Sequence, residues 1–141
     1  MDKDSNIPFE DQFFDVVVAW NVLYYNSYDR MKTVLNDLYR ALKPGGRFLS
    51  AICRGNDIVS LVSKEISKKD RVVNKNVSDQ SGAVINVLKT EAEIKEDYSI
   101  FNNLEIGYCE IKLNNILNSY WIIYGEKSWT ILLKEVYLHD T

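Results

Sequence analysis

The stretch IPFEDQFFDVVVAWNVLYY, residues 7–25, dominates the interpretation of this chain of 141 residues. Its centre, residues 14–19, is an unbroken apolar run rich in valine. That pattern is typical of a strand covered on both faces, as in a parallel sheet. Only six mostly polar residues, MDKDSN, precede the stretch. A strand with a central character therefore stands at the beginning of the sequence, without the neighbours that such a strand needs.

The segment after this strand has the pattern of an amphipathic helix. Asn26 or Ser27 can cap its start, and Asp29 suits the positive end of the helix. Its apolar residues recur at helical spacing: Met31, Val34, Leu35, Leu38 and Leu42. Pro44 predicts the end of the helix, Gly45 and Gly46 permit a reversal, and residues 47–52 read as the next strand. Strand, helix and strand in this order predict a right-handed parallel crossover.

The rest of the sequence alternates short elements with polar connections. Asn56 or Asp57 can cap a second helix, and residues 64–81 read as a polar surface loop or lid. Thr90 begins a TEAE capping box after a short strand. Two further strands form the hairpin LEIGYCEIKL–NNILN–SYWIIY, with a bulge or a strong twist expected near Cys109. The extension 127–141 fits either a helix or another strand.

Composition excludes several classes of protein. The net charge of −3 provides no basic field for nucleic acid or an anionic membrane. No apolar run reaches the length of a spanning helix, and MDKDSN does not resemble a signal peptide. Two distant cysteines, Cys53 and Cys109, fit buried free thiols rather than a disulfide framework or a metal site. We therefore expect a cytoplasmic protein without a bound metal.

Two motifs together resemble those of a known family. IPFEDQFFDVVVAWNVLYY followed by VLNDLYRALKPGGRFL resembles the class I S-adenosylmethionine-dependent methyltransferases of the small-molecule branch called type 11. The match lies in Ile7, Pro8, Phe9, Phe14, Asp15 and the run 42–46. In that family these motifs surround the fourth strand and precede the fifth. The resemblance implies S-adenosylmethionine as the cofactor and a small molecule as the methyl acceptor.

The resemblance also implies what the sequence lacks. The family orders its strands 3-2-1-4-5-7-6, and this chain matches only strands 4-5-7-6, over residues 1–126. Strands 1–3 and the Gly-rich cofactor loop have no counterpart, so we expect a partial Rossmann-like α/β sheet whose strand 14–19 is an open edge. An open edge of this kind predicts a partner, which could be a second copy, the missing N-terminal half or the chain's own tail.

Candidate site residues follow from the same resemblance. Asp4 and Ser5 precede the turn that borders the adenine, and Trp20 and Asn21 follow the strand at its ligand end. Tyr24 and Tyr25 occupy positions that face the substrate in relatives, and Arg54 could meet an anionic substrate. Each also has a plain structural reading: a frayed terminus for the first pair, packing or a turn for the next four, and a surface position for Arg54. No catalytic base is evident.

Two hypotheses remain for function. The chain is either the C-terminal half of a methyltransferase, inactive or nearly so alone, or a non-catalytic module that uses the remnant sheet for oligomerisation or partner binding. The absent glycine loop favours the second hypothesis for the isolated chain. The residues after strand 14–19 favour the first.

Overall fold

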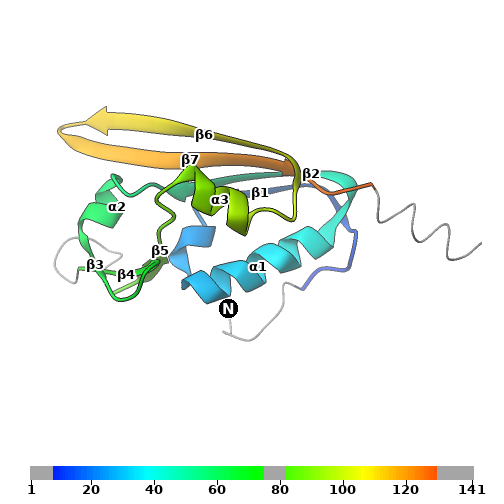
Figure 1. The fold of residues 1–141 in the computed structure, drawn as a ribbon, viewed down its shortest axis with the longest axis horizontal. Coiled ribbons are helices and arrows are strands. Elements are labelled where there is room, and N and C mark those ends of the chain that lie inside the picture. The colour runs from blue at the N-terminus through cyan, green and yellow to red at the C-terminus, as the bar shows by residue number, and fades with distance from the viewer. Residues whose placement is uncertain (1–7, 75–81, 130–141) are drawn as a thin grey trace, which may run out of the picture.

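The computed structural model of the protein describes residues 8–74 and 82–129. Its main sheet has four strands in the order β1-β2-β7-β6 (Figure 1). These strands are β1 (Phe14–Trp20), β2 (Leu42–Cys53), β6 (Asn102–Leu113) and β7 (Ile116–Glu126). β1 runs parallel to β2, and β7 is antiparallel to both β2 and β6. The family resemblance implied this order, including the insertion of the last strand between the second and third.

Helix α1 (Tyr28–Ala41) makes the crossover between the two parallel strands. The Ser27 hydroxyl accepts a hydrogen bond from the Arg30 backbone N–H at 3.2 Å, so the predicted cap is present. The helix ends at Ala41, before Lys43, the residue that Pro44 disfavours in the helical conformation. Gly45, at φ +78°, makes a backbone turn within the first residues of β2, where the register with β1 shifts.

The polar stretch after residue 63 is not simply a surface loop. Beyond the short helix α2 (Ile58–Leu61), β3 (Ser63–Glu65), β4 (Asp70–Val73) and β5 (Val84–Asn86) form a second, antiparallel sheet. The lid interpretation is therefore wrong for the part up to residue 74, and residues 75–81 lie outside the described chain. Backbone hydrogen bonds between β4 and β5 hold this segment in an extended conformation although its composition is polar.

The β6–β7 hairpin turns at Asn114 and Asn115, whose φ values of 51° and 62° suit a type I′ turn. The expected bulge near Cys109 is wrong, because the register runs without a break from Glu105 to Leu113. The irregularity lies earlier, between Asn102 and Glu105, where Asn103 has φ 51°. The change of apolar parity near Cys109 reflects an exposed strand rather than a distorted one.

The core fills only one side of the main sheet. Helix α1, the 3-10 turn η1 (Leu23–Tyr25) and helix α3 (Glu91–Asp97), capped by Thr90, all lie on that side (Figure 1). Phe48 is fully buried there and stacks on Phe101 with ring centroids 4.6 Å apart. Val17 and Ala19 of β1 point into this core. We call this side the covered face.

The opposite side of β1 and β2, which carries Val16, Val18, Trp20 and Leu49, is the open face. Val16, Val18 and Trp20 are 54%, 58% and 49% exposed. Among the described residues no helix lies on this side (Figure 1). The expectation that the valine run is covered on both faces is thus met on one face only. Within the same residues, β1 pairs with β2 alone, so its outer edge is unpaired.

Candidate functional site

The carboxyl ends of β1 and β2 form the end of the sheet where open α/β folds bind ligands. Trp20 is the last residue of β1, and Asn21 follows it in the left-handed conformation at φ 55°. The Asn21 N–H donates to the carbonyl of Ala51 at 2.8 Å. This bond prolongs the parallel ladder by one residue and fixes the point where the chain leaves the sheet.

Asn21 and Trp20 both present groups that a ligand could use. The Asn21 Oδ1 atom is buried and has no hydrogen-bond partner among the described residues. A buried amide oxygen without a donor is unfavourable, so a ligand N–H or O–H at this point would remove a cost of about 1–3 kcal/mol. The half-exposed Trp20 indole adds a flat apolar surface beside it.

Tyr24 and Tyr25 lie in η1, directly after this turn. Their rings are 4.2 Å apart between centroids, and Tyr24 is buried. The Asn86 amide holds the turn in place by donating to the carbonyls of Leu23 and Asn26, each at 3.0 Å. Burial, and then the hydrogen bond with Tyr25, raises the pKa of Tyr24 far above its ordinary value. The Tyr24 phenol therefore stays neutral.

Asp57, Cys53 and Tyr120 surround the tyrosine pair from the β2 and β7 side. The Asp57 carboxylate is buried and accepts from the backbone N–H groups of Ser119 at 2.7 Å and Val59 at 3.0 Å. Burial raises the pKa of Asp57, against the effect of these two bonds. Burial likewise raises the pKa of the Cys53 thiol to about 12, which leaves it protonated and unreactive at neutral pH.

Arg54 turns away from β1 and towards the β6–β7 hairpin. Its guanidinium lies 4.3 Å from the ring centre of Tyr108 and 4.6 Å from that of Trp121. Its Nη1 donates to Glu110 at 2.8 Å and to the Ser119 hydroxyl at 3.2 Å. The Arg54 guanidinium is thus largely engaged in contacts with Glu110, Ser119 and two aromatic rings of the protein itself.

The structure describes the positions of five of the seven sequence-predicted site residues. Trp20, Asn21, Tyr24 and Tyr25 lie along one continuous segment at the ligand end, and Arg54 stands at the same end with its charge already paired. Asp4 and Ser5 lie outside the described residues. Sequence reasoning missed Tyr120 and Glu110, because a long hairpin brings them to the site and no local spacing signals it. It named Asp57 only as a helix cap.

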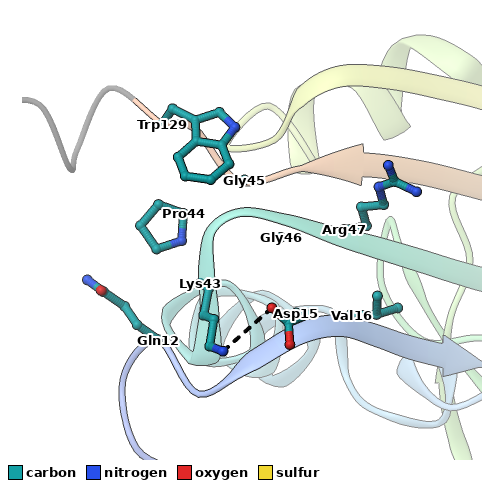
Figure 2. A pocket seen from close by; sticks show the side chains of 9 residues that line it. All are labelled: Gln12, Asp15, Val16, Lys43, Pro44, Gly45, Gly46, Arg47 and Trp129. Atoms are coloured by element: carbon teal, nitrogen blue, oxygen red, sulfur yellow. Dashed lines mark ion pairs between the residues drawn. The ribbon is translucent and has the colours of Figure 1, made fainter.

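An open pocket lies at the opposite, amino-terminal end of the sheet (Figure 2). Its lining includes Val16, Pro44, Gly45, Arg47 and Trp129. Lys43 and Asp15 form an exposed ion pair at its rim, 3.5 Å apart. Because it is remote from the carboxyl ends of β1 and β2, this pocket is separate from the candidate site.

Neither a metal centre nor a membrane helix is found in the part of the chain that the structure describes. No group of three or more His, Cys, Asp or Glu side chains is placed to hold a metal ion there. Among the same residues, no helix combines the length and apolarity needed to cross a bilayer.

Comparison with known proteins agrees with the fold and with the sequence motifs. Residues 2–50 match the methyltransferase domain family. The structure is similar to an S-adenosylmethionine-dependent methyltransferase of Methanosarcina mazei, with a TM-score of 0.63 and 14% identity. The chain has the class I S-adenosylmethionine-dependent methyltransferase fold. It also resembles a possible histamine N-methyltransferase of Thermotoga maritima, with a TM-score of 0.57 and 19% identity.

A third similar structure contains ligands of this enzyme class. It is the 1,6-didemethyltoxoflavin-N1-methyltransferase of Burkholderia thailandensis, with bound 1,6-didemethyltoxoflavin and S-adenosylhomocysteine, at a TM-score of 0.56 and 16% identity. These three matches cover 91%, 87% and 89% of this chain but only 65%, 60% and 48% of the other proteins. The chain therefore spans about half to two thirds of a methyltransferase of this type. No curated protein sequence matches it.

Proposed function

We propose that this chain is the C-terminal part of an S-adenosylmethionine-dependent methyltransferase, and that it forms the substrate side and one wall of the cofactor site. The observation that carries the proposal is the ligand end of β1. There the half-exposed Trp20 and the unpartnered Oδ1 of Asn21 stand beside an unpaired strand edge. A complementary part of the enzyme, joined along that edge, would complete the site.

The cofactor fits this end of the sheet only in part. Trp20 and Asn21 would contact it, the first through its apolar ring and the second through an acceptor oxygen that lacks a donor. The sequence has no glycine before Gly45, so a glycine loop ahead of β1 is absent from this chain. Most of the cofactor affinity must then come from the complementary part, and Asp4 and Ser5 remain proposed contacts.

Bound S-adenosylmethionine would supply an electrophilic methyl group on a sulfonium sulfur. The role of this chain is to orient a small-molecule acceptor, for which Tyr24 and Tyr25 form a rigid aromatic wall held by Asn86. Alignment of the attacking atom with the methyl group supplies much of the rate in such a transfer. We assign no catalytic base, and Arg54 acts through its bond to Glu110 rather than on the substrate.

The three indole N–H groups allow a direct test with S-adenosylhomocysteine as the probe. Trp20 stands at the proposed site, Trp121 donates its indole N–H to Leu88 in the core at 2.9 Å, and Trp129 lines the remote pocket. Millimolar S-adenosylhomocysteine should shift the Trp20 indole resonance in a nitrogen–proton correlation spectrum and leave the other two unchanged. Trp20→Phe should assign the resonance, and Asn21→Ala should weaken binding.

The same titration separates the proposal from its alternative when it is combined with a light-scattering mass. Weak, Trp20-specific binding by a monomer supports an enzyme part that lacks its complement. Micromolar binding by a monomer would show that no complement is needed and would overturn the proposal. The unpaired edge of β1 favours the second candidate, a non-catalytic oligomerisation or partner-binding module. A defined dimer with no shift of Trp20 at any concentration would establish that candidate.

A further inference from the structure

The outer edge of β6 is the second unpaired edge of the main sheet. Among the described residues β6 pairs with β7 alone (Figure 1). The strand has 12 residues without a proline, and its register with β7 is unbroken from Glu105 to the turn. Tyr108, Ile111 and Leu113 are 63%, 56% and 70% exposed. A long, regular and exposed edge strand is a template for pairing with another strand.

The β6–β7 turn determines which backbone groups of β6 point outward. Leu113 and Ile116 flank a turn of two residues, so they form the hydrogen-bonded pair that closes the turn. Hydrogen-bonded and non-hydrogen-bonded pairs alternate along an antiparallel ladder. Leu113 and Ile111 therefore direct their N–H and C=O groups to β7, whereas Lys112 and Glu110 direct theirs outward. Near the turn, the outward backbone groups thus belong to the two charged residues.

The last five residues of β6, CEIKL at 109–113, form a self-complementary sequence. When two copies run antiparallel with Ile111 opposite Ile111, Glu110 of each copy lies opposite Lys112 of the other. Cys109 then lies opposite Leu113 on the other face of the sheet, so apolar side chains also meet. Cross-strand pairs of both kinds stabilise a sheet.

Other registers of this pairing are disfavoured. A slip of two residues brings Glu110 opposite Glu110, and a slip of two residues the other way brings Lys112 opposite Lys112. Like charges directly opposite each other are destabilising. A slip of one residue opposes outward backbone groups with groups that already bond to β7. The register centred on Ile111 is therefore distinguished from each of its neighbours.

The two charged side chains are available for this pairing. Glu110 accepts three hydrogen bonds, all at its Oε1 atom, and their donors are Arg54, Asn56 and Ser119. The bond from Asn56 is the main cause that lowers the pKa of Glu110, so the group is charged at neutral pH. Lys112 is exposed, and its side chain makes no hydrogen bond or ion pair within the described residues.

We propose that two copies of this chain associate through antiparallel pairing of β6 with β6, centred on Ile111. The pair between Glu110 and Lys112 occurs twice by symmetry, and each occurrence exchanges two backbone hydrogen bonds. A second copy fits this edge because one segment supplies both halves of the complementary pattern. The inference does not rest on the proposed methyl transfer, and it leaves the edge of β1 available, because β1 lies at the opposite side of the sheet.

Light scattering of the full chain at increasing concentration tests the association. The unaltered chain should approach twice the mass of one chain, and Lys112→Glu should weaken the association about tenfold or more, because glutamates then oppose each other twice. Lys68→Glu, at an exposed position between β3 and β4, changes the net charge equally and should associate like the unaltered chain. An unaltered chain that stays monomeric, or a Lys112→Glu variant that associates unchanged, would overturn the proposal.

A mixture of two charge variants tests the pairing itself. Glu110→Lys and Lys112→Glu should each be monomeric alone. Their equimolar mixture should form a heterodimer, because each acidic position of one variant meets a basic position of the other. A mixture that remains monomeric would contradict the pairing. The monomeric Lys112→Glu variant also allows the S-adenosylhomocysteine titration to be read at Trp20 without association.

Disulfide trapping tests the register. Ile111→Cys in a Cys109→Ser background should form a disulfide between two copies under mild oxidation, because a non-hydrogen-bonded pair brings its two Cβ atoms close together. Ile116→Cys in the same background is the matched control, since Ile116 is 47% exposed near the same turn but lies on β7, and it should remain reduced. The unaltered chain should also remain reduced, because Cys109 lies opposite Leu113. Cross-linking through Cys109, or none through Ile111→Cys, would overturn this register.

Discussion

The two faces of the main sheet differ far more than the sequence of β1 would suggest. On the covered face Val17 and Ala19 join a core with Phe48, Phe101 and α1. On the open face the alternate residues of the same strand are about half exposed. An unbroken apolar run therefore indicates that both faces of a strand suit burial. It does not indicate which segment covers each face.

The largest expected effect separates the two faces directly. Phe48 is fully buried and stacks on Phe101, so Phe48→Ala should reduce the free energy of unfolding by about 3–5 kcal/mol. Val18→Ala, at the centre of the exposed apolar row of β1, should cost below about 1 kcal/mol. Denaturant titration of both variants gives the comparison.

A contrary result would be informative for either face. A cost for Val18→Ala close to that of Phe48→Ala would mean that the open face is as tightly packed as the core.

A smaller effect, with opposite signs on the two faces, is expected at two strand glycines. An added Cβ at Gly125, on the covered face, would lie 2.6 Å from Phe101 Cβ, whereas a Cβ at Gly107, on the open face, would meet nothing within 4 Å. Gly125→Ala should therefore cost about 1–3 kcal/mol through overpacking. Gly107→Ala should stabilise the protein by about 0.5 kcal/mol, because alanine loses less backbone entropy than glycine.

Thermal unfolding of the two alanine variants measures this difference. If Gly107→Ala is destabilising, another segment must pack closely against β6 at that point. If Gly125→Ala is neutral, the aromatic contact at Phe101 is looser than its position in the core requires.

The sequence predicted the β1–α1–β2 unit well because its signals there are local, whereas the order of the main sheet followed from the family resemblance. The Ser27 cap, the apolar spacing of α1 and the stop before Pro44 depend on residues close together in the chain. Of the second sheet, the sequence predicted only the short strand before Thr90, which is β5. β3 and β4 escaped prediction because backbone pairing, as between Arg71 and Ile85, holds segments whose composition resembles that of a loop. Cys109 was expected to be buried, yet it is exposed because β6 is an edge strand with little packed on it.

The candidate site shows the same difference between local and long-range signals. Trp20, Asn21, Tyr24 and Tyr25 lie in one short segment at the end of β1, so a motif was enough to propose them. Tyr120 and Glu110 reach the site from the hairpin, more than 50 residues from Arg54 in the case of Glu110. Nothing in their own surroundings in the sequence marks them, and the pairing of Arg54 with Glu110 is equally a product of the tertiary fold.

The smallest expected effect is a pH dependence that arises from Asp57, the buried carboxyl group at the ligand end. Burial raises its pKa in the folded protein above that in the unfolded chain. The folded state then binds the proton more tightly, so the free energy of unfolding must fall as the pH rises from the unfolded-chain value through the raised folded value. Asp57→Asn should remove this fall, because the amide that replaces the carboxyl group binds no proton in this pH range.

Asp15→Asn is the matched control, because it removes one exposed carboxylate and changes the net charge equally. Denaturant titrations at several pH values between about 3.5 and 7 should show the same slope for the control and the unaltered chain. If the free energy of unfolding of Asp57→Asn still falls with pH to the same extent, the proton belongs to another group. A steeper slope would mean that the Ser119 and Val59 bonds outweigh burial and that the Asp57 carboxylate stabilises the ligand end in its charged form.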